Sequence, residues 1–282
     1  MSSAPWDYIA KLVCIGDSGC GKSSLTIRLC EGRFVQHHDV TIGVEFGSRL
    51  VPVGPPHSNN SPSSATALPP PTKEDAAEGG STLSAGLPEP RTKKPVSANA
   101  PANAPPAQEQ KHMKLSLWDT AGQETYKSVT RSYFRGASGA LLVFDLSRKQ
   151  TFQHVTDWLN DLRQIAEPDI VVVLVGNKAD LAKTGDDADG GNKREVTREE
   201  AEEWAKRNGV LEYVETSAKS GENVEKAFMR VAERIYENIQ AGKYDLNDRR
   251  SGVKGPAATG AGSRAVRLAA DKKNAGVGGG CC

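Results

Sequence analysis

The sequence predicts an α/β domain built around a doubly wound, mostly parallel sheet with helices on both faces. Short apolar runs alternate with amphipathic helical patterns. Two of the runs, residues 140–145 and 170–176, are continuously apolar up to the terminal Asp145 and Gly176, which is typical of strands covered on both faces. Polar motifs directly follow several runs, at the strand ends where such sheets bind ligands. We expect six strands, at residues 8–15, 44–51, 113–118, 140–145, 170–176 and 211–215.

Helical periodicity supports the elements between these strands. Residues 151–166 carry their apolar side chains on one face, and residues 224–240 repeat the pattern with Phe228, Val231 and Ile235. Both segments therefore predict helices that pack one face on the sheet. In chain order, we expect helices at residues 22–31, 126–136, 151–166, 198–208 and 224–240.

Composition divides the chain into one domain and three segments without a core pattern. Residues 52–110 hold 13 of the 16 prolines and no Phe, Trp, Tyr or Ile, so they cannot bury enough apolar surface to offset the entropy of ordering. We expect a disordered insert there, within a domain that spans residues 8–240. Residues 1–7 and the Gly- and Ala-rich residues 241–282 are expected as tails. The sequence leaves open whether the insert is an idle linker, a regulatory site or a gene-model artefact.

Composition also disfavours several classes of protein. The net charge of +1 gives no extended basic field, so we expect no nucleic-acid partner. No run approaches the roughly 18 apolar residues that a membrane-spanning helix needs, and residues 1–7 lack the apolar core of a signal peptide. The five cysteines show no metal-ligand spacing. We therefore expect a reducing, cytosolic environment without disulfides.

The most informative motif is G-D-S-G-C-G-K-S, residues 16–23, between an expected strand and an expected helix. Its glycines let backbone N–H groups surround a phosphate chain, and the helix N-terminus adds a positive dipole end. Lys22 supplies a charge for the outer phosphates, and the Ser23 hydroxyl suits Mg²⁺. A Gly-rich turn that binds nothing is the alternative. The expected phosphate-loop contacts are Ser18, Gly19, Cys20, Gly21, Lys22, Ser23 and Ser24.

A second motif, W-D-T-A-G-Q-E, occupies residues 118–124 after an expected strand. Asp119 can hold the Mg²⁺ shell, although by itself it could equally cap a turn. The N–H group of Gly122 can meet a terminal phosphate. Gln123 has a donor and an acceptor, which suits the orientation of an attacking water.

Two further motifs follow later strands: N-K-A-D at residues 177–180 and T-S-A-K at residues 216–219. The Asp180 carboxylate can accept two hydrogen bonds from guanine, whereas adenine would leave it unpaired. The Lys178 stem can lie across the base, and Asn177 is expected to tie loops together. Ser217, Ala218 and Lys219 complete the expected base site, with the Ala218 N–H toward the guanine oxygen. Each tetrapeptide alone could be a simple turn.

In this order and spacing the four motifs resemble those of Ras-superfamily small GTPases, and specifically the Rab family. The Rab resemblance rests on I-G-V-E-F (42–46), K-L-S-L-W-D-T-A-G-Q-E (114–124), K-S-V-T-R-S-Y-F-R-G (127–136) and L-V-F-D-L-S (142–147). Residues 38–47 resemble the branch that serves early secretory and endosomal recycling membranes. The insert lies where the family has a tight hairpin.

The resemblance implies the G-domain fold of P-loop NTPases, and it assigns further roles. Thr41 would complete the Mg²⁺ shell and meet the γ-phosphate only in the GTP state, and Phe34 would pack against guanine. The metal ligands would then be Ser23, Thr41 and Asp119. The expected effector surface is Ile42, Phe46, Trp118 and Tyr133, although the three aromatic residues could instead be ordinary core.

The resemblance further implies a GTP-hydrolysing switch in vesicle traffic, with Gln123 and Lys22 as its catalytic residues. Slow intrinsic turnover would be raised by a GTPase-activating protein. An exchange factor, a GDP-dissociation inhibitor, a prenylation escort and effectors are the other implied partners. Cys281 and Cys282 would carry geranylgeranyl groups, anchoring the protein to cytosolic faces of Golgi or early and recycling endosomal membranes between periods in the cytosol. The basic surplus of the tail fits an anionic leaflet or a solubilising linker equally.

Two other functions compete with this one. An inert binding scaffold of the same fold is expected to have lost Lys22, Thr41 or Gln123, and all three are present. A P-loop kinase for a small molecule would need a substrate lid, and it would leave N-K-A-D and the terminal cysteines unexplained.

Overall fold

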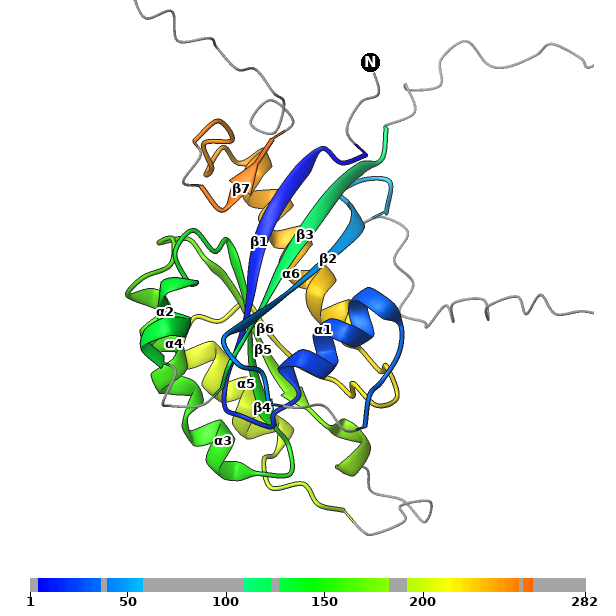
Figure 1. The fold of residues 1–282 in the computed structure, drawn as a ribbon, viewed down its shortest axis with the longest axis vertical. Coiled ribbons are helices and arrows are strands. Elements are labelled where there is room, and N and C mark those ends of the chain that lie inside the picture. Colours follow the sequence, from blue (N-terminus) through cyan, green and yellow to red (C-terminus); the bar gives the residue numbers. More distant parts are fainter. Residues whose placement is uncertain are drawn as a thin grey trace, which may run out of the picture.

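The computed structural model describes residues 5–36, 40–57, 109–122, 127–182, 192–248 and 251–255, and of residues 127–129 only the backbone. Six strands lie in the order β2-β3-β1-β4-β5-β6, and β7 lies beside β1 (Figure 1). All pairs are parallel except β2 with β3 and β7 with β1. The strands are β1 (Tyr8–Ile15), β2 (Val44–Val53), β3 (Lys111–Thr120), β4 (Gly139–Asp145), β5 (Val171–Asn177), β6 (Glu212–Glu215) and β7 (Val253–Lys254).

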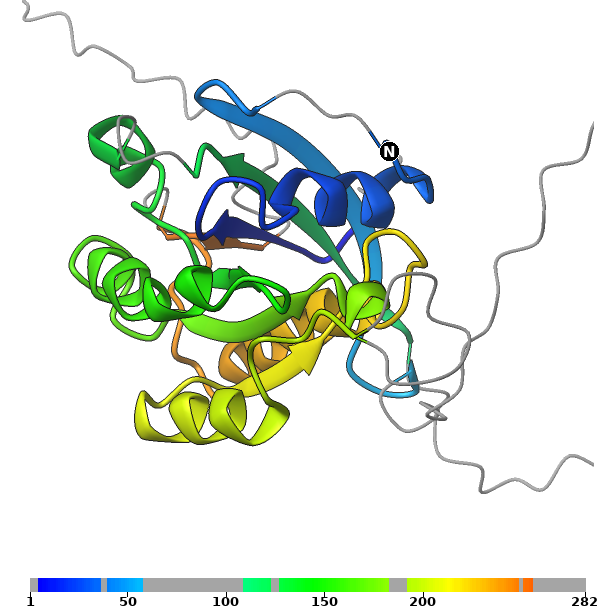
Figure 2. The same cartoon turned by 90° about the horizontal axis from the view of Figure 1, so that it is seen from below.

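Helices cover both faces of the sheet, which confirms the predicted fold class (Figure 2). Side chains of β1 alternate between the two cores: Leu12 and Cys14 face α1 and α6, whereas Val13 and Ile15 face α3, α4 and α5. β4 and β5 are buried along their whole length, as their unbroken apolar runs predict. The helices are α1 (Lys22–Glu31), α2 (Lys127–Ser132), α3 (Lys149–Gln153), α4 (Val155–Arg163), α5 (Arg198–Arg207) and α6 (Val224–Gln240), with a 3₁₀ turn at Ala179–Leu181.

The helix expected at residues 151–166 is two consecutive helices, α3 and α4. His154 interrupts the regular pattern, yet its N–H still donates to the Gln150 carbonyl (3.3 Å) and its carbonyl accepts from the Trp158 N–H (3.2 Å). Backbone hydrogen bonds of the helical i→i−4 type therefore continue from α3 into α4 across His154. The expected helix at 126–136 is shorter as well: α2 ends at Ser132, and the next two residues donate i→i−3 turn bonds.

The boundaries of the insert are narrower than the sequence suggests. β2 and β3 pair as far as Pro52 with His112 and Val53 with Lys111. Proline is tolerated here because β2 is an edge strand. The Gln110 side-chain amide joins the start of β3 to the end of β2. It donates to the Val53 carbonyl and accepts from the His57 N–H, both at 3.0 Å. Residues 58–108 lie outside the described residues.

Part of each expected tail is bound to the domain. At the N-terminus, the Asp7 carboxylate accepts from the His112 N–H (2.9 Å) and pairs with Lys111 (3.0 Å). At the other end, residues 241–248 and 251–255 fold against the sheet and supply β7, a seventh strand that the sequence analysis missed. Val253 is completely buried, which explains why this segment docks. Residues 256–282 lie outside the described residues.

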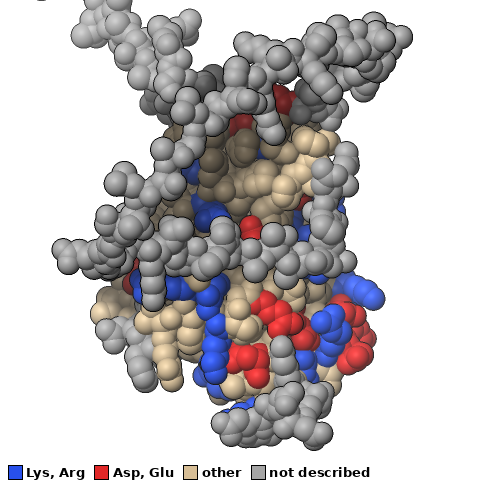
Figure 3. Space-filling view, turned by 90° about the vertical axis from the view of Figure 1, so that its right-hand side faces the viewer, with Lys and Arg blue, Asp and Glu red and all other residues tan. Residues whose placement is uncertain are grey.

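The described surface carries mixed charge. Figure 3 shows basic and acidic side chains side by side across the lower part of one face, which agrees with the net charge of +1. Within the described ranges, no helix combines the length and the apolar composition that crossing a bilayer requires.

Phe228 provides a test of the core that joins α6 to the sheet. Its side chain is fully buried, so Phe228→Ala is expected to lower the free energy of unfolding by about 3–5 kcal/mol. The matched control is Phe46→Ala, which removes a ring from a residue that is 66% exposed and is expected to cost only about 0.5–1.5 kcal/mol. Urea unfolding measures both, and equal losses would contradict the packing described.

Candidate functional site

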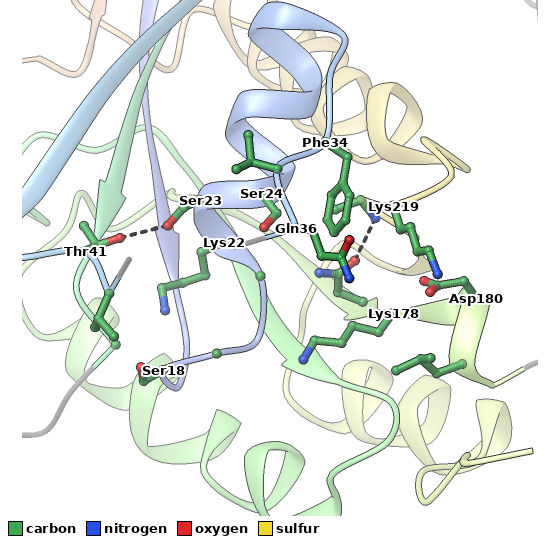
Figure 4. Close-up of a pocket in the computed structure, with 18 residues that line it drawn as sticks. Ser18, Lys22, Ser23, Ser24, Phe34, Gln36, Thr41, Lys178, Asp180 and Lys219 are labelled. Atoms are coloured by element: carbon green, nitrogen blue, oxygen red, sulfur yellow. Dashed lines mark hydrogen bonds between the residues drawn. The ribbon is translucent and has the colours of Figure 1, made fainter. Parts of the chain in front are cut away.

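A pocket of about 430 Å³ opens where the segments that follow β1, β3, β5 and β6 meet α1 (Figure 4). Ser18, Lys22 and Ser23 gather at one end of it, and Asp180 and Lys219 lie at the other. Most residues expected at the nucleotide and metal sites line it: Ser18, Gly19, Gly21, Lys22, Ser23, Ser24, Phe34, Thr41, Gly122, Asn177, Lys178, Asp180, Ala218 and Lys219.

Four of the expected site residues do not line this pocket or cannot be placed. Cys20 belongs to the phosphate loop, but its side chain is fully buried. Ser217 is also buried, and its hydroxyl donates to Asp180. Asp119 lines an adjoining hollow of about 100 Å³. Gln123 lies outside the described residues. The sequence analysis missed four lining residues, and nothing in their types signalled a site: Val35, Gln36, Val40 and Leu181.

The phosphate loop is shaped by glycines in conformations that other residues rarely adopt. Gly16 has φ +137°, and a Cβ atom there would lie 2.0 Å from the Val143 carbonyl oxygen. Gly21, with φ +90°, occupies the N-cap of α1 and supplies no side-chain cap. The first N–H groups of α1 therefore stay available to an anion.

Lys22 lies beneath this loop and is buried. Its ammonium donates to the carbonyl oxygens of Gly16 and Asp17, both at 2.9 Å. Burial lowers the pKa of Lys22. Gly122 approaches so closely that a Cβ atom on it would lie 2.4 Å from the Lys22 nitrogen. The W-D-T-A-G-Q-E motif therefore contacts the phosphate loop at Lys22.

The three predicted metal ligands lie together. The hydroxyls of Ser23 and Thr41 are 2.8 Å apart, and the Thr41 hydroxyl donates to Oδ2 of Asp119 at 3.3 Å. Asp119 is buried, burial raises its pKa, and its Oδ1 has no hydrogen-bond partner among the described residues. One carboxylate and two hydroxyls form an all-oxygen donor set, which Mg²⁺ prefers. The orphaned Oδ1 adds to that fit, because a buried charge needs a partner.

Asn177 ties three loops together at the base of the pocket. Its side-chain NH₂ donates to the Cys20 carbonyl (2.8 Å), and its side-chain oxygen accepts from the Thr216 hydroxyl and the Ala218 N–H (both 3.2 Å). These bonds join the phosphate loop to both base motifs. The expected contact between the Ala218 N–H and guanine must compete with the bond to Asn177.

The base end of the pocket is organised by two carboxylates. Asp180 accepts from the Ser217 hydroxyl at 2.6 Å. Buried Asp145 pairs at 2.8 Å with Lys178, whose backbone is in a left-handed conformation (φ +67°). Burial alone would raise the pKa of Asp145, but hydrogen bonds from Lys178 and Ser147 outweigh burial and keep this pKa below its usual range.

Asp145 also reaches the phosphate loop through Arg148, a connection that the sequence analysis missed. Arg148 donates to the Asp145 carboxylate and to the Ser18 carbonyl oxygen, both at 3.0 Å. On the same side of the loop, the Asp17 carboxylate accepts from the indole of Trp158 at 2.8 Å and contacts His154 at 2.7 Å. The position of Asp145 at the carboxyl end of a buried strand was the available signal.

Of the four expected effector residues, two are exposed and two are partly buried, and Trp118 packs against the core that contains Val13 and Phe134. Phe46 is 66% and Ile42 82% exposed. The Phe46 ring meets Trp118 edge-on at 4.3 Å, and Trp118 lies 5.5 Å from Tyr133. We call Phe46, Trp118 and Tyr133 the aromatic surface. It is a contiguous apolar patch that a partner could cover.

Comparison with known families adds one finding. A sequence model of the Ras family matches residues 11–59 and 98–237. The matched segments span more than half of the chain, and they include all four motifs. The gap between them falls in the insert, and the match ends within α6.

Asn177→Ala tests the tie between the loops. The change leaves a buried carbonyl oxygen and two buried donors without their partner, each at a cost of about 1–3 kcal/mol. We therefore expect bound GDP to dissociate at least about tenfold faster, measured by exchange of a fluorescent GDP analogue. The control is Asn160→Ala on the exposed face of α4, which should leave the rate unchanged. Equal rates in both variants would refute the tie.

Proposed function

The chain belongs to the Ras family, and on that premise we propose that it is a Rab-type switch in intracellular vesicle traffic. Membership makes it a small GTPase, which binds GTP and hydrolyses it to GDP and phosphate with Mg²⁺. The observation that carries the proposal is the pocket in which Asn177 joins the phosphate loop to the base motifs.

The proposed chemistry uses residues at the phosphate end of this pocket. A water attacks the γ-phosphorus in line, a new P–O bond forms, and the bond to the β–γ bridging oxygen breaks. Lys22 and the N–H groups of the loop stabilise the charge that develops, and Gln123, outside the described residues, orients the water. Mg²⁺, held by Ser23, Thr41 and Asp119, would neutralise phosphate charge when it is bound.

The switch would arise from two residues that line the pocket and belong to different segments of the chain. Thr41 and Gly122 both line the pocket, and both would contact the γ-phosphate. Hydrolysis removes these contacts, so the segments around residues 35–43 and 121–134 would change conformation. Effectors that bind one conformation better would then read the nucleotide state at Ile42 and the aromatic surface.

The geometry also supports a slow enzyme that needs a partner. Arg148 reaches the phosphate loop, but it is committed to the Ser18 carbonyl and to Asp145. We therefore propose that a GTPase-activating protein supplies an arginine, and that an exchange factor releases GDP. Cys281 and Cys282 would be geranylgeranylated by way of a prenylation escort, and a GDP-dissociation inhibitor would extract the protein from Golgi or endosomal membranes.

Asp180 tests the base assignment. Because its carboxylate would bind the 2-amino group of guanine, wild type should prefer GTP to ITP, which lacks that group, by about 10–100-fold. In Asp180→Ala this ratio should fall toward one, whereas Asp157→Ala, a change on the exposed face of α4, should preserve it. Competition against a labelled GDP measures both ratios. ATP that binds as tightly as GTP would sink the guanine assignment.

The terminal cysteines test the membrane role. A double variant, Cys281→Ser with Cys282→Ser, should lose membrane partition in cells and stay in the soluble fraction, because one or no lipid chain anchors poorly. Its affinity for GDP should not change. The matched control is Ser251→Ala in the described part of the tail. A double variant that still fractionates with membranes would contradict the anchoring proposal.

A further inference from the structure

The first part of the tail is integrated into the domain. After α6 the chain turns back, and Tyr244 and Leu246 pack on the same core as Phe228 and Ile235. Val253 is completely buried in that core. The Gly255 N–H donates to the Leu246 carbonyl and closes the segment on itself. We call residues 244–255, without the undescribed 249 and 250, the docked segment.

The docked segment pairs with the first part of β1, along an edge that β4 does not cover. β4 pairs with β1 only from Leu12 onward, so the earlier part of β1 would have an open side. β7 occupies that side, with Val253 opposite Ala10 and Lys254 opposite Ile9. The Lys11 N–H donates to the Gly252 carbonyl at 2.9 Å. Pairing satisfies backbone groups that would otherwise lie at an exposed edge.

Docking of β7 requires a glycine at position 252. A Cβ atom there would lie 2.0 Å from the Gly136 carbonyl oxygen and 2.9 Å from the Ser138 nitrogen, both backbone atoms. The Ser138 hydroxyl is also 3.4 Å from the Gly252 carbonyl oxygen. A side chain at this position would therefore force the docked segment away from β1. Gly255 is different, because a Cβ atom there meets Leu246 at an ordinary 3.4 Å.

Lys11 links the docked segment to the aromatic surface. Its backbone N–H binds Gly252, and its carbonyl accepts from the Ser138 N–H. Its ammonium lies 4.0 Å over the centre of the Trp118 ring and donates to the Arg135 carbonyl at 2.9 Å. A cation in this position attracts the ring face. One residue therefore contacts the tail through its backbone and the aromatic surface through its side chain.

We propose that docking of the tail and the state of the aromatic surface are coupled through Lys11. When β7 is in place, hydrogen bonds hold both the N–H group and the carbonyl of Lys11, and its ammonium is fixed over Trp118. When β7 is released, the bond from the Lys11 N–H to the Gly252 carbonyl is lost. The Lys11 ammonium is then held less firmly over the Trp118 ring. A protein partner that covers the aromatic surface would therefore favour the docked tail, and the docked tail would favour that partner to the same degree. The partner part rests on the proposed function, whereas the coupling itself does not.

The test uses the full-length protein with GDP bound and two variants that undock β7. Gly252→Val introduces the backbone clash, and Val253→Ser removes the buried side chain without a clash. Gly255→Ala is the matched control. Hydrogen exchange at the Lys11 amide reports docking, because that N–H donates to Gly252. The indole NMR signal of Trp118 reports the aromatic surface. Trp158 and Trp204 serve as references, because they pack on the core that Trp118 also contacts and not on the core of the docked segment.

Both undocking variants should exchange the Lys11 amide at least about tenfold faster, since an amide that loses its bond becomes accessible. Both should also shift the Trp118 indole signal and leave those of Trp158 and Trp204 in place. The control should match wild type in both respects. Faster exchange with an unmoved Trp118 signal would overturn the coupling, and unchanged exchange in both variants would overturn the docking. GDP dissociation should stay at the wild-type rate, so a failed GTPase assignment and a failed coupling remain distinguishable.

Discussion

The nucleotide pocket depends on one buried amide, the side chain of Asn177. A doubly wound sheet brings several strand ends to one edge, but it does not by itself fix the loops that follow them. Asn177 bonds to the loop after β1 and to the loop after β6 from its own place at the end of β5. All three of its bonds are buried, so any rearrangement of one loop leaves polar groups unpaired. The three bonds of Asn177 therefore fix the distance between the phosphate end and the base end of the pocket.

A second layer of residues surrounds the pocket and supports its lining. Asp145 binds Lys178 on one side and Arg148 on the other, and Arg148 continues to the Ser18 carbonyl. Asp17 is held by Trp158 from α4. These contacts connect both halves of the pocket to the helices behind them. Sequence motifs reveal residues whose types suit a ligand, whereas these supports act on the backbone of other residues and depend on how distant elements pack.

The fold was predictable where local patterns were strong. The unbroken apolar runs of β4 and β5 and the single apolar faces of the helices identified the layers correctly, because each pattern follows from burial of that element alone. The segment that forms β7 has no such pattern. Val253 is an isolated apolar residue among polar and glycine neighbours, and its partner Ala10 lies at the other end of the chain. Composition similarly placed the insert boundary at Pro52, although pairing with β3 carries the strand through Val53.

The position of β7 also fixes where the rest of the chain departs. β7 lies beside the beginning of β1, whereas the phosphate loop follows the end of β1, so the two are at opposite poles of the domain (Figure 1). The remaining residues, 256–282, can span at most about 95 Å when fully extended. That tether starts at the pole farthest from the phosphate loop. Lipids on Cys281 and Cys282, as proposed above, would therefore be tethered to the pole of the domain opposite its nucleotide pocket.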